Sequence, residues 1–413
     1  MGRTTSVVIL QPSYLFSTMA QEQTEAIGTQ KNIATSNGAP KPAIAKAGLE
    51  DVIAGVSEIC FLDGKHGILA YRGYNIHDLV KGTFEETIHL LLYGKLPNQD
   101  ELGRFNEKLI ESRTLPPQVM EHIGRLPKNI HPMAALRTLV SEAALYDPKA
   151  DDMSREANIE KGIRMIGMIP LMVAYYDATR NGRPFLKPNE ELGHAANFLY
   201  MVLGKEQDAD VVKMFDTALT LHADHELNAS TFTARCIAAT LSDMYSAITG
   251  AIGALKGPLH GGANEQVMRM LLRIGNPATA KEWTIDALAR KEKIMGFGHR
   301  VYRTEDPRAT HLRKFSEAMG KRTGQTQWYE MSRTIEQFIL EEKKLYSNVD
   351  FYSASTYYLM GIPLDLYTPI FAISRISGWV AHLLEQYDHN RIIRPMAEYV
   401  GPVDCEWQPI EQR

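Results

Sequence analysis

The spacing of apolar residues predicts helices along most of the chain. An apolar stripe at helical spacing covers 84–92, with a capping box at Thr83 and Glu86 before it and Gly94 after it. Asn98 and Glu101 open the next helix in the same way. Similar patterns predict further helices over 132–146, 154–179, 191–203, 210–221, 264–274, 281–293, 307–319, 328–346 and 369–386.

Three segments depart from this simple pattern. Residues 57–74 alternate in the manner of strands around a turn at Asp63 and Gly64, which predicts a β-hairpin. Residues 229–255 are almost entirely apolar and predict one long helix buried on most sides. Pro170 predicts a kink within the helix at 154–179. We therefore expect a mainly α protein with one small hairpin.

Composition places the chain among ordinary globular proteins. It has 413 residues, of which 44% are hydrophobic and 23% are charged. The formal net charge of −4 argues against general nucleic-acid binding. Cys60, Cys236 and Cys405 lack the paired spacing of a zinc site or disulfide framework, and no apolar run is long enough to span a membrane. We expect a cytoplasmic protein of closely packed domains with no membrane or nucleic-acid partner.

The first residues form a separate case. Residues 1–47 are rich in Ala, Thr, Gln, Ser and Gly and lack sustained periodicity, which predicts a flexible arm. A transit peptide and N-terminal myristoylation are alternatives, because the first twenty residues contain no acid and Gly2 fits a loose acylation pattern. Met19 is a second possible start.

A polar cluster interrupts the helical pattern at 222–228. His222, Asp224, His225 and Glu226 are all possible metal ligands. Two histidines three residues apart are nevertheless a weaker signal than the His-Glu-x-x-His helix of zinc enzymes. Spacing alone leaves three interpretations open: a metal site, a capped helix end, and a site for an anion or a carbonyl group.

His260 stands in a glycine-rich turn directly before a predicted helix. Asn264 is placed to cap that helix, so backbone N–H groups and the positive end of the helix dipole converge near the imidazole. This environment disfavours the imidazolium form and makes His260 a neutral hydrogen-bond donor. The alternative is an exposed histidine on an ordinary turn.

The segment 296–308 combines two glycines, His299 and the arginines Arg300, Arg303 and Arg308. The glycines permit close approach of the backbone to a ligand, and phosphates or carboxylates are the natural partners of guanidinium groups. Cations at the start of a helix oppose its dipole, so a bound anion explains them better than a solvated basic loop does.

Two charged residues stand out further along the chain. Asp350 is most simply the N-cap of the helix that follows it. Arg375 lies within an otherwise apolar helix, and a buried arginine requires a partner, for which a carboxylate is the best geometric match. Arg394, near the C-terminus, is less informative by itself.

Taken together, these clusters describe one kind of chemistry. A carboxylate base, two neutral histidine donors and several arginines are the groups needed to abstract a proton next to a carbonyl while a polycarboxylate partner is held. No serine or cysteine nucleophile motif competes with this interpretation.

In four places the sequence resembles the citrate synthase family. The strings at 257–264, 296–302, 306–308 and 348–353 are similar to its signature motifs in order and spacing, and 222–230 is similar to the bacterial form. The resemblance extends from about Gly48 to the C-terminus. It implies a large helical domain, 48–262 plus 361–413, and a small domain, 263–360, that closes over the active site. It also implies a homodimer, and we expect no hexamer because no N-terminal β domain is recognised.

The resemblance assigns roles to individual residues. It implies that Asp350 is the base that deprotonates the acetyl-CoA methyl group, and that His260 donates a hydrogen bond to the resulting enolate oxygen. His299 is implied to polarise and protonate the oxaloacetate carbonyl. The residues implied to bind oxaloacetate are His225, Arg308, Arg375, Arg72 and Arg394, the last across the dimer interface.

The same resemblance implies coenzyme A thioester as co-substrate, with no metal and no permanently bound cofactor. The residues implied to contact coenzyme A are Ile294, Met295, Gly296, Phe297, Gly298, Arg303, Lys343, Lys344 and Asn348. The implied reaction is the entry step of the tricarboxylic acid cycle, which yields citrate and free coenzyme A. A 2-methylcitrate synthase using propionyl-CoA is an alternative, since one methylene is worth only about 1–3 kcal/mol of discrimination. A non-catalytic acyl-CoA or citrate sensor is another.

Overall fold

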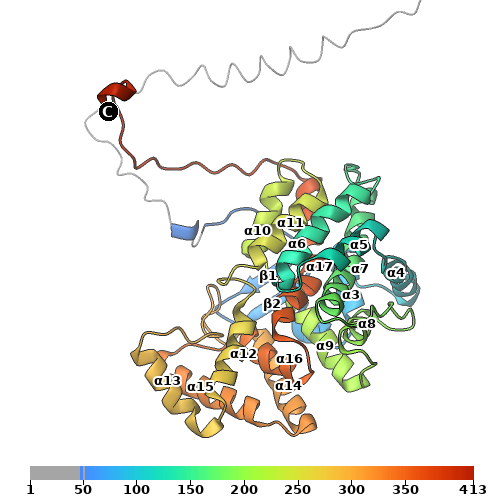
Figure 1. The fold of residues 1–413 in the computed structure, drawn as a ribbon, viewed down its shortest axis with the longest axis vertical. Helices are drawn as coiled ribbons and strands as arrows, with labels where there is room; N and C mark the ends of the chain where they lie inside the picture. The colour runs from blue at the N-terminus through green and yellow to red at the C-terminus, as the bar shows by residue number, and fades with distance from the viewer. Residues whose placement is uncertain (1–46, 50–51) are drawn as a thin grey trace, which may run out of the picture. The chain divides into compact units, whose positions relative to one another are not determined.

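The computed structural model describes residues 47–49 and 52–413 (Figure 1). The flexible arm predicted at 1–47 lies outside the described residues, apart from its last position. Residues 55–395 form one compact unit. The described residues of 47–54 and 396–413 belong to another, with single 3-10 turns at Ala47–Leu49 and Ile410–Gln412. No helix among the described residues has the length and apolar character needed to cross a membrane.

The unit at 55–395 is mainly helical, as predicted, and most predicted helices are confirmed to within a few residues. Its α-helices are α2 (Ile76–Leu79), α3 (Phe84–Tyr93), α4 (Gln99–Glu111), α5 (Pro117–Arg125), α6 (Pro132–Ala143), α7 (Arg155–Arg180), α8 (His194–Leu203), α9 (Ala209–His222), α10 (Ala229–Ala238), α11 (Met244–Leu255), α12 (Ala263–Ile274), α13 (Ala280–Ala289), α14 (Pro307–Thr323), α15 (Gln327–Lys343), α16 (Val349–Leu359) and α17 (Tyr367–Asp388).

The predicted hairpin is present and carries one additional short strand. The strands β1 (Cys60–Asp63), β2 (Ile68–Tyr71) and β3 (Tyr74–Asn75) form an antiparallel sheet in the order β1-β2-β3. Asp63 closes the first turn, because its Oδ1 accepts hydrogen bonds from the backbone N–H groups of the two residues that follow Gly64.

The predicted long helix at 229–255 is wrong in one respect: the segment forms two helices, α10 and α11, packed against each other. The chain reverses between them, with Leu241 in the left-handed region at a φ of 63°. Asp243 then caps α11 by accepting a hydrogen bond from the Ser246 N–H. Both helices are apolar toward the core, so hydrophobic periodicity alone does not reveal the break. α7, in contrast, continues through Pro170 as a single element.

Two predicted helix caps are also wrong. α16 is capped by Asn348, whose Oδ1 accepts from the N–H of Asp350, so Asp350 lies inside the first turn. The N-cap of α12 is Gly262, and Asn264 is buried within the helix. In both cases the polar side chain is turned into the protein interior, which is where the candidate chemistry lies.

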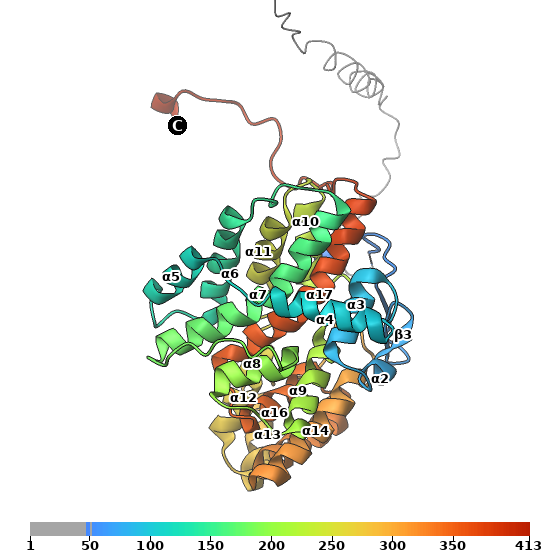
Figure 2. The same ribbon diagram turned by 90° about the vertical axis from the view of Figure 1, so that its right-hand side faces the viewer.

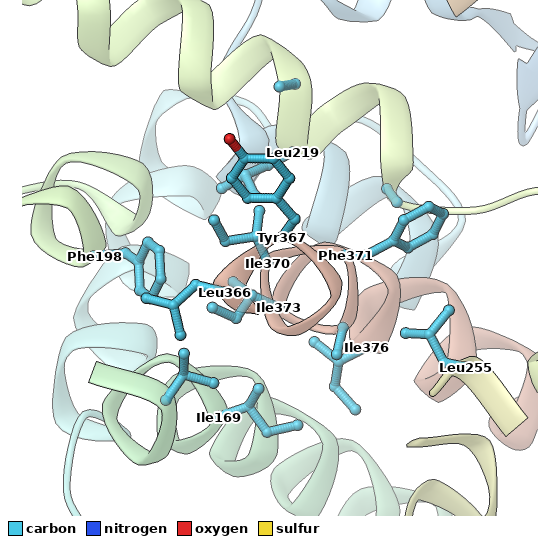
Figure 3. Packing of buried hydrophobic residues seen from close by; sticks show 14 of the residues in the cluster. Ile169, Phe198, Leu219, Leu255, Leu366, Tyr367, Ile370, Phe371, Ile373 and Ile376 are labelled. Atoms are coloured by element: carbon cyan, nitrogen blue, oxygen red, sulfur yellow. The ribbon is translucent and has the colours of Figure 1, made fainter. Parts of the chain in front are cut away.

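α17 is the central helix of the hydrophobic core and packs against α3, α7, α9, α10 and α11. In Figure 3, Ile169 of α7, Phe198 of α8, Leu219 of α9 and Leu255 of α11 lie around it. A side chain on α17 is therefore held by packing on several sides. This matters because Arg375 lies in the middle of this helix.

The helices α12 to α16 form a second group. α14 and α12 pack on α16, and α13 packs on α15. Both views show these yellow and orange helices gathered at one end of the unit, away from α10 and α11 (Figures 1 and 2). The predicted small domain at 263–360 spans these helices, and both its existence as a separate domain and its movement stay predictions.

Candidate active site

Six of the predicted residues come together from segments far apart in the sequence. Nε2 of His225, in the turn after α9, lies 3.3 Å from Oη of Tyr302, and the rings of His225 and His299 have centroids 5.1 Å apart. Nε of Arg375 donates to the carbonyl of His222 at 2.7 Å. The charges of Arg308 and Arg375 both act on Asp350, at the start of α16, and that of Arg375 acts on His260. The group comprises His225, His260, His299, Arg308, Asp350 and Arg375.

His299 is held as a neutral donor. Its Nδ1 accepts hydrogen bonds from the backbone N–H groups of Val301 at 3.0 Å and Tyr302 at 3.2 Å. Since Nδ1 must carry the lone pair, the proton resides on Nε2. Burial and the charge of Arg308 lower the pKa of His299 to about 4, so the ring is uncharged near neutral pH.

His260 is the second neutral donor. Its Nε2 accepts from the backbone N–H of Ser230 at 3.3 Å and lies 2.8 Å from the Ser230 hydroxyl, which also accepts from Nε1 of Trp379. Nε2 therefore carries the lone pair, and Nδ1–H is available to donate. Burial, followed by the charge of Arg375, lowers the pKa of His260 to about 4. The neutral state agrees with the sequence prediction, although burial rather than the helix dipole is the main cause.

Asp350 has the properties of a base. Its side chain is buried, and Oδ1 has no hydrogen-bond partner among the described residues. Burial raises its pKa from 3.8 to about 7, although Arg308 acts in the opposite direction. A carboxylate whose ionised form receives so little stabilisation accepts a proton readily.

The two buried arginines differ in how they are paired. Arg308 binds Asp306 in a bidentate manner, from Nε at 2.9 Å and from NH2 at 2.8 Å, which leaves NH1 for another anion. Within the described residues, Arg375 donates a hydrogen bond only from Nε, to a backbone carbonyl, and its guanidinium lies 4.7 Å from the ring centre of Phe371. Two buried cations with N–H groups to spare can bind the carboxylates of a small polycarboxylate.

The cluster at 222–228 fits a helix end that faces this anion site. His222 donates from Nδ1 to the carbonyl of Ala218 at 2.7 Å, and burial lowers its pKa to about 3. Burial also lowers the pKa of His225, so both rings are neutral. Oδ2 of Asp224 accepts a hydrogen bond from Nε2 of His382 at 3.2 Å. Across 47–49 and 52–413, no group of three or more His, Cys, Asp or Glu side chains is arranged to hold a metal ion.

The segments 294–298 and 344–348 lie side by side. Phe297 and Ser347 form an antiparallel bridge, and Asn348 donates to the carbonyls of Gly296 at 2.9 Å and Gly298 at 3.0 Å. Gly296 has a φ of 85°, a conformation that favours glycine. The buried or half-buried members of the predicted coenzyme A set are Ile294, Met295, Gly296, Phe297, Gly298 and Asn348.

A cavity of about 150 Å³ adjoins His299 on this side. Gly298, Arg303 and Lys344 are among its lining residues. Arg303, Lys344 and Lys343, the last residue of α15, are exposed. Arg303 and Lys344 are two cations lining a hollow that Gly298 also borders, an arrangement that suits a phosphate-bearing ligand.

Two predicted residues are not joined to the cluster by contacts within the described chain. NH2 of Arg72 donates to the carbonyl of Leu91 in α3 at 3.3 Å. Arg394 is exposed in the segment that follows α17.

The sequence analysis did not single out Ser230 and Tyr302 individually, although both lie inside strings that it singled out. It also missed His382, because a lone histidine in an apolar helix gives no signal.

Comparison of the sequence and fold with known proteins identifies the family of this chain. The family described as citrate synthase, C-terminal domain, matches residues 48–396. Citrate synthase 2 of Bacillus subtilis is 52% identical over 371 residues, which cover 89% of this chain and 99% of the relative. For 2-methylcitrate synthase 1 of Corynebacterium glutamicum the identity is 41%, with 89% and 98% covered. A solved ternary complex of Thermoplasma acidophilum citrate synthase with carboxymethyl coenzyme A and oxaloacetate superposes with a TM-score of 0.85 and 34% identity, covering 89% of this chain and 99% of that one. The chain therefore belongs to the citrate synthase family.

Proposed function

We propose that this chain is a citrate synthase that condenses acetyl-CoA with oxaloacetate and hydrolyses the intermediate to citrate and coenzyme A. The observation that carries the proposal is the buried Asp350 carboxylate, with one oxygen unpartnered, in the same site as two neutral histidine donors and two buried arginines. The 52% identity to a citrate synthase over nearly the whole length of that relative supports the same reaction.

The first step is removal of a proton from the acetyl methyl group. Asp350 takes this proton, and its raised pKa brings its basicity close to what operation near neutral pH requires. The thioester oxygen gains electron density as the enolate forms. Nδ1–H of His260 donates a hydrogen bond to that oxygen, because Nε2 is occupied by Ser230.

The second step forms the carbon–carbon bond. The enolate carbon attacks the ketone carbon of oxaloacetate, and Nε2–H of His299 supplies the proton to the ketone oxygen. Arg375 and NH1 of Arg308 bind the substrate carboxylates, and His225 contacts the same substrate. Water then cleaves the thioester bond, which releases citrate and the free thiol of coenzyme A.

Coenzyme A is proposed to lie along the paired loops 294–298 and 344–348, with its phosphates near Arg303, Lys343 and Lys344. The cavity of about 150 Å³ lined by His299, Arg303 and Lys344 supports this placement. We further propose that residues 263–360 close over the bound substrates and exclude water. The proton transfers of enolisation and condensation are assigned to side chains of this protein, and the proposed reaction uses no metal.

The proposed assembly is a homodimer in which Arg394 of each subunit reaches the partner's active site. Its exposure in the single chain agrees with such a role. A cytoplasmic location and a place at the entry of the tricarboxylic acid cycle remain predictions from the sequence. Light scattering tests the assembly, and a monomeric or hexameric mass would contradict it.

A second candidate is a 2-methylcitrate synthase that uses propionyl-CoA. A relative with that name is 41% identical to this chain, against 52% for a citrate synthase, so acetyl-CoA is the favoured substrate. The difference between the two substrates is a single methylene in the acyl pocket.

The test is release of free thiol from coenzyme A with oxaloacetate and either acetyl-CoA or propionyl-CoA, compared as kcat/KM. A strong preference for acetyl-CoA is expected. Equal or faster turnover of propionyl-CoA would assign the second candidate. Asp350→Ala should abolish turnover while oxaloacetate still binds, and a wild-type rate in this variant would refute the mechanism. Asp216→Asn is the matched control, because Asp216 is also buried, but its Oδ1 accepts from the Phe84 N–H and its Oδ2 lies 3.5 Å from Nζ of Lys213.

A further inference from the structure

Arg375 poses a problem of charge balance. Its side chain is 1% exposed, and within the part of the chain that the structure describes it forms no ion pair with a carboxylate. Arg308, by contrast, has the bidentate partner Asp306. Burial lowers the pKa of Arg375 to about 10, and the charge of Asp224 acts in the opposite direction. A buried guanidinium without a counter-charge costs folding free energy. Asp224 is the negatively charged group that acts on Arg375.

Asp224 is built as a buried anion. Its side chain is fully inaccessible, and Oδ2 accepts hydrogen bonds from Nε2–H of His382 and from the backbone N–H of Glu226, both at 3.2 Å. Oδ1 has no partner among the described residues. Burial alone would raise the pKa of Asp224, but the interactions with His382 and Arg375 outweigh it and lower the pKa.

His382 is itself held in one tautomer. Its Nδ1 lies 3.2 Å from NH1 of Arg235, which can only donate, so Nδ1 carries the lone pair and Nε2 carries the proton that Asp224 accepts. NH1 of Arg235 also donates to Glu385 at 2.6 Å, and Glu385 accepts from the backbone N–H of Glu58 at 2.8 Å. A continuous polar chain thus runs from Glu58, at the edge of the unit, to Asp224.

The backbone brings Asp224 to the helix that carries Arg375. At Gly378, one turn after Arg375 on α17, a Cβ atom would lie 2.5 Å from Oδ1 of Asp224 and 2.4 Å from the carbonyl of Ala223. Only a residue without a side chain lets α17 approach this turn so closely. Asp224 is therefore pressed against α17 beside Arg375 without forming a salt bridge to it.

We propose that Asp224 is a positioning residue for the substrate: its carboxylate keeps the Arg375 guanidinium charged and oriented without occupying the N–H groups that must bind a substrate carboxylate. His382 and Arg235 hold Asp224 in its ionised form. A nearby anion that forms no salt bridge to Arg375 suits this purpose, because a direct salt bridge would compete with the substrate. The inference rests on the proposed function, since the substrate is taken to be a dicarboxylate such as oxaloacetate.

The experiment compares oxaloacetate binding by calorimetry and steady-state kinetics in Asp224→Asn and the wild type. We expect the Kd and KM for oxaloacetate to rise at least about tenfold, with a much smaller change in kcat. Asp177→Asn is the control for simple loss of a buried carboxylate, because Asp177 is equally inaccessible and pairs with Arg180 and Arg183. That control should lower the Tm but leave the Kd unchanged.

The pH dependence separates this role from a structural one. Loss of Asp224 should lower the pKa of Arg375 further, so the Kd of Asp224→Asn should rise more steeply than that of the wild type between pH 8 and pH 9.5. Asp350, with a pKa of about 7, is already ionised there. The other charged or titratable groups that act on Arg375 do not change their charge in this pH window. His222 and His260 stay neutral, and Arg308 stays charged. Tyr71 and Cys60 stay protonated because burial raises their pKa values.

A second pair of variants covers the case in which Asp224→Asn does not fold. His382→Leu removes the hydrogen-bond donor to Asp224 and favours protonation of that carboxylate. At pH 6 the Kd of this variant for oxaloacetate should therefore exceed that of the wild type, and the difference should shrink as the pH increases to 8. His382→Gln retains an N–H donor and should stay near the wild type. An unchanged Kd in both Asp224→Asn and His382→Leu would overturn the inference. If the wild type binds oxaloacetate but shows no turnover, the proposed function fails while the binding comparison still tests Asp224.

Discussion

Replacing Asp350 by asparagine is expected to abolish turnover and, at the same time, to stabilise the folded protein above neutral pH. Burial raises the pKa of the Asp350 carboxyl from 3.8 to about 7. Ionising this carboxyl therefore costs about 4 kcal/mol more in the folded protein than in the unfolded chain. Asparagine has nearly the same shape and no proton to lose, so it escapes this cost.

The sign follows from proton binding. Between about pH 4 and about pH 7 the unfolded chain has released this proton while the folded protein still binds it, so stability falls as the pH rises. Above about pH 7 both states are ionised, and the penalty of about 4 kcal/mol is constant. The advantage of Asp350→Asn over the wild type should thus grow by about 3 kcal/mol between pH 5 and pH 8.

The assay is urea unfolding of Asp350→Asn and the wild type at both pH values and equal protein concentration, combined with thiol-release kinetics. Asp216→Asn is the control, since burial raises the pKa of Asp216 to about 6 in a place outside the active site. It should also gain stability above that pH, by a smaller amount, and should keep its activity. A stability difference for Asp350→Asn that does not depend on pH would refute the reasoning, as would retained turnover.

Three further outcomes are expected. Because Asp350 must be ionised to act, kcat/KM for acetyl-CoA should rise with pH and level off above about pH 7, and a flat profile in initial-rate measurements would contradict this. Ser230→Ala removes the hydroxyl beside Nε2 of His260, so kcat in the thiol-release assay should fall about 10- to 100-fold while oxaloacetate binding is little changed; an unaltered kcat would argue against this role. Gly296→Ala must place a Cβ at a φ of 85° and 2.7 Å from a phenylalanine ring, whereas Gly324→Ala has a φ of 67° and open space. Thermal unfolding should therefore show a loss of about 1–3 kcal/mol more for Gly296→Ala, together with a raised KM for acetyl-CoA, and equal losses would rule out the steric argument.

The fold class and most helices could be predicted from the sequence because their signals are local. The capping box of α3 is present as predicted, with Thr83 accepting from the Glu86 N–H and Glu86 accepting from the Thr83 N–H, and Gly94 ends that helix in the left-handed conformation. These interactions join residues within one or two turns of each other. Amphipathic spacing adds which face is buried, and neither signal requires knowledge of the rest of the chain.

Local signals failed where a long-range contact decides the local structure. The sequence predicts one helix over 229–255 because the segments on both sides of the break are apolar. The chain nevertheless reverses at Leu241, so that α10 and α11 pack together. Asp350 reads as a cap because aspartate often caps helices, yet Asn348 takes that place and Asp350 turns inward.

The candidate site divides in the same way. Resemblance to a family singled out His260, His299 and Asp350 from strings of a few residues, whereas the chemical state of each depends on groups distant in the sequence. Ser230, thirty residues before His260, decides which nitrogen of that ring carries the proton.

By itself, therefore, the sequence determined the helices, the small hairpin and the candidate catalytic residues. The tertiary structure alone decided that burial is what keeps the histidines neutral, that the pKa of Asp350 is raised to about 7 and that Arg375 has Asp224 as its counter-charge. The physical reason is that helix formation depends on neighbours along the chain. The pKa of a side chain depends instead on burial and on nearby charges, and both are set only when distant segments pack together.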